Sequence, residues 1–431
     1  MYFIYNILLL LAFAVLAPLP ALLMLLSRKR RHVFVERCAL AYTDDLTGFA
    51  LCPLWVHAVS VGEVMASVQL IQELKRRFPE RPVVLSTTTE TGHATARRHA
   101  RTADAIVYFP FDLPPIVTCA VRCIQPEVFI ALETEIWPNL YLALHKQGVP
   151  IMIASGRISE KSFPRYRALR FFFARVLARV SRFCMQSPSD AERIIAIGAA
   201  EDRVSVSGNI KFDLSVPDVT EDEQQELLDL FNLDPKQPLL IAGSTHRGEE
   251  QQVLEMFREL HTEIPDLVLL IAPRHPERFE EAAQAIAASG LAFVRRTAMQ
   301  DGARRTTEPV ILLDTIGELA RLYSIGTVIF IGGTLVEGIG GHNPLEPAAA
   351  GKPSLFGPHM QNFRRIARVL TTRQAAFQVH GREELTEKTR ELLRSPELRA
   401  QTAAAAREVI QRNSGAAAHI ADAVQSVLKQ P

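Results

Sequence analysis

The chain alternates between short apolar runs and longer stretches with the periodicity of amphipathic helices. One series of apolar runs occupies residues 54–59, 83–88, 105–108, 128–132 and 150–155. A second series repeats this rhythm at residues 238–243, 266–272, 309–314, 327–332 and 352–357. Strands that alternate with helical segments predict βαβ units and parallel sheets. Because the runs are continuously apolar, we expect helices to cover both faces of each sheet.

A polar and acidic segment at residues 215–238 separates the two series. It carries prolines and then a run of acidic residues, glutamines and leucines, which is typical of a hinge followed by a capped helix. A chain of 431 residues is also long enough for two cores. We therefore predict an α/β protein with Rossmann-like domains at residues 32–216 and 217–431. Ligands of such sheets bind beyond the carboxyl ends of the strands, so we expect the loops of both domains to line one cleft.

The start of the chain predicts a membrane anchor. Residues 1–27 carry no charge, and the apolar run from Ile7 to Leu26 is long enough to cross a bilayer as a helix. The basic residues 28–31 follow this run, and the positive-inside rule then places the body of the protein in the cytoplasm. Because Pro18 and Pro20 interrupt the run, a hairpin in one leaflet and a buried core helix are the alternatives.

A second segment with membrane character lies at residues 161–182. It contains seven basic residues, no acidic residue, and an aromatic cluster formed by Tyr166 and the residues Phe171 to Phe173. A basic amphipathic helix of this kind suits the anionic headgroups of a membrane. A solvated basic face, or packing of the aromatic side chains into the protein's own core, is the alternative interpretation.

Composition and charge narrow the functional classes. The formal net charge of +1 gives no general basis for binding nucleic acid, so no nucleic-acid partner is expected. The five cysteines form no CxxC pair, which indicates neither a disulfide framework nor a zinc site. The sequence also lacks a DxD pair in a plausible loop, so we expect neither a divalent cation nor another cofactor.

Three segments of the first half carry candidate chemistry. Glu63 lies in the first turn of a helix, where the helix dipole and amide donors hold a carboxylate ionised and able to accept a proton; simple capping is the alternative. Glu133 and Glu135 follow another apolar run and are suited to position an acceptor or balance developing charge, or to pair with arginines. Lys211 follows a Gly-Asn turn near the hinge, from which it can reach a leaving phosphate.

The second half begins with a candidate phosphate site. The segment AGSTHRGEE at residues 242–250 combines an apolar run, a turn of small residues and an acidic helix start. The amides near Ser244 and Thr245 are therefore candidates to cradle a phosphate, and His246 and Arg247 are placed to add positive charge.

Three further loops of the second half are suited to hold a nucleotide. The rigid loop at residues 273–276 can pair with the edge of a base through its backbone. The DTIGEL loop at residues 314–319 follows another apolar run, at the place where the same nucleotide would lie. The glycine-rich run at residues 330–363 places Glu346 at a helix start, suited to bind both ribose hydroxyls with the help of Asn343. Capping of that helix is the alternative role of Glu346.

Seven motifs, in this order, resemble the 3-deoxy-D-manno-oct-2-ulosonic acid (Kdo) transferases of Gram-negative bacteria: HAVSVGE, ETEIWPN, GNIKFD, AGSTHRGEE, RHPERF, DTIGEL and GGHNPLEPAAAGKP. The resemblance spans nearly the whole chain. It implies a GT-B fold and an inverting, metal-independent transfer of Kdo from CMP-Kdo to the 6'-hydroxyl of a tetra-acylated lipid A precursor, with further Kdo additions possible. It also implies a place in lipopolysaccharide synthesis at the cytoplasmic face of the inner membrane, with a single-pass or monotopic anchor at residues 1–31.

The resemblance gives the candidate residues their roles. It implies that Glu63 is the general base, and that Glu133 and Lys211 stabilise the transition state. It makes residues 32–216 the acceptor domain and residues 217–431 the donor domain. Together with the phosphate cradle, the expected CMP-binding residues are Ser244, Thr245, Pro273, Arg274, Ile316, Gly317, Glu318, Leu319, Asn343, Pro344, Leu345 and Glu346.

Two rival interpretations share part of this pattern. A GT-B transferase or epimerase that uses a UDP-sugar has the same paired sheets and a ribose-binding glutamate. A non-catalytic nucleotide-binding protein docked at a membrane would keep the second domain and use the first for a partner. Against the latter, a binding module has no evident need for both Glu63 and Glu133.

Overall fold

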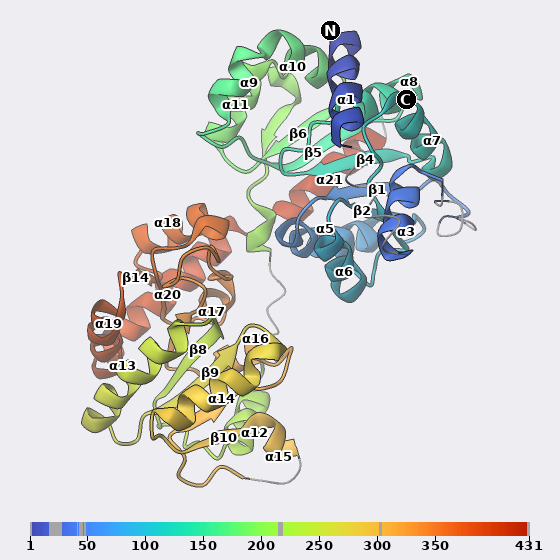
Figure 1. Ribbon diagram of the computed structural model, residues 1–431. Coiled ribbons are helices and arrows are strands. Elements are labelled where there is room, and N and C mark those ends of the chain that lie inside the picture. The colour runs from blue at the N-terminus through green and yellow to red at the C-terminus, as the bar shows by residue number, and fades with distance from the viewer. Residues whose placement is uncertain are drawn as a thin grey trace. The chain divides into compact units, whose positions relative to one another are not determined.

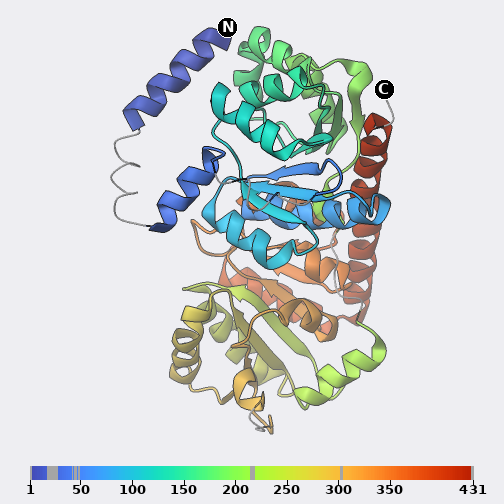
Figure 2. The same ribbon diagram turned by 90° about the vertical axis from the view of Figure 1, so that its right-hand side faces the viewer.

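The computed structural model describes residues 2–16, 28–40, 42, 46, 49–213, 219–300 and 304–428. The chain divides into two compact units: residues 1–214 together with 413–431, and residues 215–412. Each unit contains a parallel sheet of seven strands with helices on both faces (Figures 1 and 2). The predicted α/β class is confirmed. The predicted shared cleft depends on how the two units are placed, and it stays a prediction.

The first sheet has the strand order β3-β2-β1-β4-β5-β6-β7. Its strands are β1 Leu54–Ala58, β2 Val83–Thr87, β3 Ala105–Tyr108, β4 Val128–Leu132, β5 Ile151–Gly156, β6 Arg182–Met185 and β7 Val204–Val206. The helices of this unit are α1 Tyr2–Leu16, α3 Arg28–Arg37, α5 Val61–Arg77, α6 Glu90–His99, α7 Pro114–Ile124, α8 Pro138–Lys146, α9 Phe163–Ala168, α10 Arg170–Leu177, α11 Pro188–Ile197 and α21 Ala416–Leu428, with the short 3-10 helices η1 Glu201–Arg203 and η2 Ile210–Phe212.

The continuously apolar strands have two buried faces, as expected. Trp55 of β1 packs into the core on one face of the first sheet, whereas its neighbours Leu54 and Val56 pack into the core on the other face. Side chains alternate across a strand, so only a sheet covered on both faces buries every residue of such a run.

The second sheet has the strand order β10-β11-β9-β8-β12-β13-β14. Its strands are β8 Leu239–Thr245, β9 Val268–Pro273, β10 Phe293–Arg295, β11 Val310–Leu312, β12 Val328–Ile331, β13 Ser354–Phe356 and β14 Phe377–Gln378. Its helices are α12 Glu221–Leu230, α13 Glu249–Glu263, α14 Phe279–Ala288, α15 Arg296–Gln300, α16 Leu319–Leu322, α17 Leu345–Ala349, α18 Arg364–Thr372, α19 Arg382–Arg394 and α20 Pro396–Asn413, with the 3-10 helices η3 Pro276–Arg278, η4 Tyr323–Ile325 and η5 Gln361–Phe363.

The capped helix predicted after the hinge is α12. Thr220 caps it, and the Glu223 carboxylate accepts a hydrogen bond from the Thr220 amide at 2.9 Å, which completes a capping box. The hinge residues 214–218 lie outside the described part of the chain.

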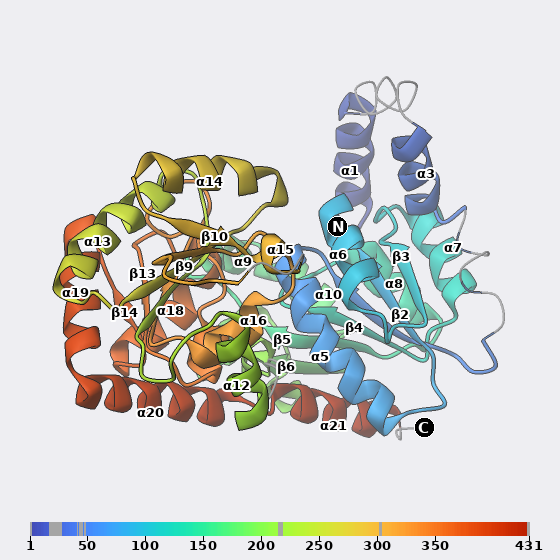
Figure 3. The ribbon, with the colours of Figure 1, turned by 90° about the horizontal axis from the view of Figure 1, so that it is seen from below.

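The division into units differs from the predicted one in the last helix, α21. It lies beside α5 (Figure 3), and Ile420 and Val424 join the core that contains Leu70. The carboxylate of Asp213 accepts a hydrogen bond from the Gly415 amide at 2.6 Å, which ties the start of α21 to η2. The apolar stripe of α21 therefore completes the first unit, although residues 413–431 follow the second unit in sequence.

The N-terminal helix α1 packs on the first unit. The Tyr5 hydroxyl donates to the Asp112 carboxylate at 2.8 Å, and Asn139 Nδ2 donates to Asn6 Oδ1 at 2.7 Å. The ring of Tyr5 lies 5.7 Å from that of Phe172 in α10. The opposite side of α1 leaves several apolar side chains exposed: Phe3, Ile4, Leu8, Leu10 and Leu11.

The predicted membrane span from Ile7 to Leu26 is only partly described, because residues 17–27 lie outside the described ranges. Among the helices that are described, none combines the length and the apolar character that crossing a bilayer requires.

The basic aromatic segment at residues 161–182 divides its side chains between core and surface. Phe172 and Phe173 pack against the core of the first unit, as one of the two alternatives supposed. Phe171 is exposed, with 56% of its surface accessible.

Candidate active site

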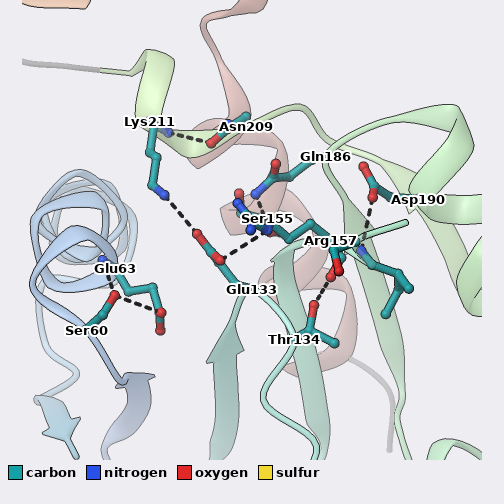
Figure 4. A network of polar contacts seen from close by, with 12 residues as sticks. Ser60, Glu63, Glu133, Thr134, Ser155, Arg157, Gln186, Asp190, Asn209 and Lys211 are labelled. Carbon is teal, nitrogen blue, oxygen red and sulfur yellow. Dashed lines mark hydrogen bonds and ion pairs between the residues drawn. The ribbon is translucent and has the colours of Figure 1, made fainter. Parts of the chain in front are cut away.

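Two predicted catalytic residues meet at the centre of the first sheet. β1 pairs with β2 on one side and with β4 on the other, so strand order reverses between β1 and β4. In parallel α/β sheets, the loops that leave such a switch point frame the ligand site. Glu63 follows β1 and Glu133 follows β4 at this point (Figure 4).

Glu63 is held by the turn that starts α5. Its carboxylate accepts hydrogen bonds from the Val59 amide at 2.8 Å and from the Ser60 hydroxyl at 2.9 Å. The Ser60 side chain in turn caps the Glu63 amide. Ser60 is therefore the cap of α5, and the Glu63 carboxylate supports the turn that precedes the helix. These contacts also fix the direction of the carboxylate, so this supporting role and proton transfer are compatible.

The electrostatics of Glu63 differ from the sequence-based expectation. Burial raises the pKa of this carboxyl above its ordinary value, and the nearby charge of Glu133 raises it further. The hydrogen bonds from Val59 and Ser60 and the charge of Lys211 act in the opposite direction and only reduce the shift. A carboxylate with a raised pKa is a stronger base toward a hydroxyl than one held firmly ionised.

Glu133 and Lys211 form an ion pair beside Glu63. Lys211 Nζ donates to Glu133 Oε1 at 2.9 Å, and Arg157 Nε lies 3.5 Å from Glu133 Oε2 (Figure 4). The backbone of Glu133 has a φ of +54°, a left-handed conformation that non-glycine residues rarely adopt. Such a conformation costs roughly 1–3 kcal/mol and occurs preferentially at functional sites.

Lys211 owes its position to the end of β5. The Ser155 hydroxyl accepts a hydrogen bond from the Ile210 amide at 3.3 Å, and Asn209 Oδ1 caps the Lys211 amide at 3.0 Å. Gln186 Nε2 donates to the Ser155 carbonyl at 3.0 Å and supports this corner from β6. These contacts hold η2 over the sheet and direct Lys211 toward Glu133 (Figure 4).

Glu135 adds a third carboxyl group to this region. Burial raises the pKa of Glu135 to about 7, with further contributions from the charges of Glu63 and Glu133. Carboxyl groups that raise one another's pKa in a half-buried setting are typical of catalytic sites, although structural networks do the same.

In the second unit, the predicted phosphate cradle is built differently from the expectation. Ser244 and Thr245 form the end of β8 instead of a turn, and Thr245 is fully buried. The amides around the start of α13 are taken by the chain itself. The buried Glu249 carboxylate accepts hydrogen bonds from the amides of His246, Gly333, Thr334 and Leu335 at 2.6–2.9 Å.

Side chains from three loops that each follow a strand lie close together beside the start of α13. His246 follows β8, Arg274 follows β9, and His342 lies in the loop after β12. His246 Nε2 and His342 Nε2 are 2.8 Å apart, and the ring of His275 stands edge-on to His246 with centroids 5.4 Å apart. Burial, with a smaller contribution from the charge of Arg274, lowers the pKa of His342 to about 3.

Asn343 and Glu346 lie next to this cluster. Asn343 Nδ2 donates to Glu346 Oε1 at 3.3 Å, and Asn343 Oδ1 accepts from the Leu345 amide at 3.1 Å. Burial raises the pKa of Glu346, while Asn343 and Arg274 lower it in part. The structure thus brings together the predicted residues of the loops after β9 and β12.

The DTIGEL loop follows β11 as predicted. Gly317 has a φ of +95°, and the side chain of Ile316 is 44% exposed. Glu318 is engaged by Arg296 at 3.0 Å. Its carboxylate is therefore already paired with a side chain of α15.

Two residues that organise the second site were not predicted from the sequence. Glu249 binds four amides, three of which belong to residues 333–335, so its role depends on tertiary structure. Asn362 holds the glycine-rich loop through its amide, which donates to the Gly340 carbonyl at 2.9 Å, and through its side chain, which donates to Ile339 and Gly341. The high glycine content of the loop was the one available signal, because such a loop needs an external support.

Comparison with known proteins assigns the chain to a family. Residues 28–214 match the family described as 3-deoxy-D-manno-octulosonic-acid transferase (kdotransferase). The chain is 34% identical to the 3-deoxy-D-manno-octulosonic acid transferase of Haemophilus influenzae, in a match that covers 99% of both chains. It is 32% identical to the protein of the same name from Bordetella pertussis, over 87% of each chain.

A solved structure supports the fold. The glycosyltransferase from Rickettsia africae is similar with a TM-score of 0.56 and 11% identity, over 89% of this chain and 100% of that one. Two units, each built on a parallel seven-stranded sheet, have the GT-B type of fold. The chain belongs to the 3-deoxy-D-manno-octulosonic acid transferase family.

Proposed function

We propose that the protein transfers Kdo from CMP-Kdo to the 6'-hydroxyl of a tetra-acylated lipid A precursor, by an inverting and metal-independent displacement. The observation that carries the proposal is the arrangement of Glu63 beside the Glu133–Lys211 ion pair at the switch point of the first sheet. Addition of further Kdo residues to the product is compatible with the same chemistry.

In the proposed reaction, Glu63 is the general base. The acceptor hydroxyl gives its proton to the Glu63 carboxylate while its oxygen attacks the anomeric carbon of Kdo. The bond from that carbon to the phosphate oxygen breaks, and its electron pair leaves with CMP. A single displacement of this kind inverts the anomeric centre. The raised pKa of Glu63 favours the proton transfer.

Glu133 and Lys211 are proposed to stabilise the transition state. Positive charge develops on the sugar ring as the bond to the phosphate weakens, and a fixed carboxylate offsets it. Lys211 holds Glu133 in place at 2.9 Å and reduces the repulsion between Glu133 and the ionised Glu63. The first unit would then be the acceptor domain.

The second unit is proposed to bind the CMP moiety. Glu346 and Asn343 are suited to the ribose hydroxyls, because a carboxylate accepts from both at once. Arg274 is exposed, and its guanidinium has no ion-pair partner among the residues that the structure describes. The remaining proposed donor-binding residues are Ser244, Thr245, Pro273, Ile316, Gly317, Glu318, Leu319, Pro344 and Leu345.

We further infer that the protein works at the cytoplasmic face of the inner membrane, attached through residues 1–31 and 161–182. Support comes from the exposed apolar side of α1 and from its contacts with α10, which carries the exposed Phe171. Arg179 places its guanidinium 5.1 Å from the centre of the Tyr2 ring, so one basic side chain lies against the start of α1. Anionic headgroups and acyl chains would meet complementary groups there.

Mass spectrometry tests the proposed reaction. The purified protein is incubated with a tetra-acylated lipid A precursor, CMP-Kdo generated in situ, and EDTA. A mass increase of one or more Kdo units is expected, and Glu63→Gln serves as the matched inactive control. No product with CMP-Kdo, together with activity on UDP-sugars, would overturn the proposal in favour of the rival transferase class. Product that appears only without EDTA would refute metal independence alone.

A further inference from the structure

The contact between His246 and His342 restricts where their protons lie. The two Nε2 atoms are 2.8 Å apart and the rings are nearly parallel, with an interplanar angle of 11°. A hydrogen bond at this distance needs one Nε2 that carries a proton and one that does not. The pair therefore shares one proton between the rings. Its two Nδ1 atoms face away from each other, and a neutral pair protonates only one of them.

Without a ligand, the surroundings keep this pair neutral. Burial lowers the pKa of both His246 and His342. Four charged or titratable groups lie near the pair: Arg274, His275, Arg278 and Glu250. Of these four, Glu250 alone acts on the pKa of His246 in the opposite direction. Glu250 is moreover paired with Arg278 at 2.8 Å.

The backbone offers little to an incoming phosphate here. A helix start and its adjoining loop ordinarily bind anions through free amides. In this structure the Glu249 carboxylate already takes the amides of His246 and of residues 333–335. These four amides are therefore not available to a phosphate at this edge of the sheet, which favours its recognition by side chains.

The position of the pair fits a ligand site. β8 pairs with β9 on one side and with β12 on the other, so strand order in the second sheet reverses between β8 and β12. His246 follows β8 and His342 follows β12, so the pair bridges the two loops that leave this switch point. The described residues contain no group of three or more His, Cys, Asp or Glu side chains placed to hold a metal ion.

We propose that the His246–His342 pair is the phosphate-recognition element of the donor site and takes up one proton from solvent when the CMP phosphate binds. This inference rests on the proposed function. With the added proton, both Nδ1 atoms are donors and the pair carries one positive charge beside Arg274. During transfer, the bond between Kdo and the phosphate oxygen breaks and the phosphate gains one negative charge. The protonated pair offsets that charge, with no covalent step of its own.

The consequence is a measurable coupling between CMP binding and protons. An anion that binds the protonated pair raises its pKa, and binding then takes up protons at a pH between the free and bound values. Isothermal titration of CMP in buffers of different ionisation enthalpy counts these protons. At about pH 7.5, free CMP contributes little, because the second pKa of a phosphate monoester is about 6.

We expect the full-length protein to take up about one proton per CMP, because a single histidine pair is protonated. His246→Gln and His342→Gln keep a hydrogen-bonding side chain but cannot become charged. Each substitution should abolish most of the proton uptake. Each should also weaken CMP binding roughly tenfold, because one charge-assisted hydrogen bond is lost. Binding of cytidine, which has no phosphate, should be unchanged in both variants when followed by ligand-observed NMR. Unchanged cytidine binding also shows that the variants are folded.

Three results separate this inference from the proposed function. If the wild-type protein binds CMP without proton uptake, the inference is wrong and the donor site stands. If uptake persists in both variants, another group takes the proton, and the inference is again wrong. If the wild-type protein does not bind CMP at all, both the donor site and the inference fail.

Discussion

Lys211 donates a hydrogen bond to Glu133 at 2.9 Å, although the two residues are 78 positions apart in the chain. The backbone of each partner is held in place. Glu133 has a left-handed backbone, and Lys211 sits on a 3-10 helix fastened to Ser155. A pair fixed at both ends sets the electrostatic environment of Glu63 without reorganisation during a reaction, which is how preorganised charges contribute to catalysis.

The first prediction concerns the base itself. Glu63→Gln should lower the rate of Kdo transfer by about 10²–10⁴-fold, the usual contribution of a general base, and should leave CMP affinity unchanged. Transfer is measured by mass spectrometry and CMP binding by calorimetry. Near-normal turnover would show that Glu63 only supports the start of α5.

The same substitution has a consequence for stability. Because the pKa of Glu63 is raised in the folded state, its ionised form opposes folding once the pH exceeds that pKa. Glutamine removes this charge and still bonds to the start of α5 through its amide. The melting temperature of Glu63→Gln at neutral pH should therefore equal or exceed that of the wild type. A clear decrease would mean that the carboxylate is primarily structural.

The second prediction is a pair of opposite shifts in pH dependence. The reaction needs ionised Glu63, so kcat/KM should fall as the pH falls through a pKa above the ordinary glutamate value. Glu133→Gln removes a charge that raises this pKa, so the acid limb should move to lower pH. Lys211→Met removes a charge that lowers it, so the limb should move to higher pH.

Both variants should also lose transfer rate, because each removes part of the ion pair that balances charge on the sugar; roughly 10²–10³-fold is typical for one stabilising group. Lys236→Met is a suitable control, since this exposed lysine lies in the second unit. Acid limbs that shift in the same direction, or not at all, would contradict the assignment of the limb to Glu63.

Much of the fold follows from local sequence. The continuously apolar runs at 128–132 and 327–332 contain strands that are buried on both faces. Burial of this kind can be predicted from a single short stretch of sequence. β6 was missed because Arg182 begins it at the end of a basic segment. β14 has only two residues, which is too short for a pattern.

The site was predictable only in part, for a physical reason. Positions at the end of an apolar run or at the start of a helix were sufficient to single out Glu63, Glu133 and Glu346. The contacts between Lys211 and Glu133 and between His246 and His342 join segments 78 and 96 residues apart, and they depend on how loops fold back over the sheets. The raised pKa of Glu63 is likewise a property of burial and of a neighbour distant in sequence.

The third prediction tests the ribose contact. Glu346→Ala should weaken CMP binding by about tenfold or more, because hydrogen bonds to a carboxylate contribute roughly 1.5–3 kcal/mol each. Glu280→Ala, at an exposed glutamate paired with Arg295, is the matched control and should leave CMP affinity unchanged. Equal CMP affinities for both variants, measured by calorimetry, would show that Glu346 does not contact the ribose.

The fourth prediction concerns the exposed side of α1. Leu8 and Leu11 are 62% and 57% exposed, whereas Tyr5 and Asn6 face the body and hold the helix through Asp112 and Asn139. A double substitution, Leu8→Glu with Leu11→Glu, should therefore preserve the fold but remove the side chains that would enter a membrane.

Each leucine that leaves water contributes roughly 1.5–3 kcal/mol, and the added negative charges are repelled by anionic headgroups. Binding to vesicles of phosphatidylethanolamine and phosphatidylglycerol, measured by cosedimentation, should therefore fall by more than about tenfold. Val206→Glu places one such charge at another exposed apolar position, on β7, and should bind vesicles like the wild type. If the α1 variant binds vesicles as well as this control does, the membrane contact lies elsewhere in the chain, and the exposed apolar side of α1 needs a different partner.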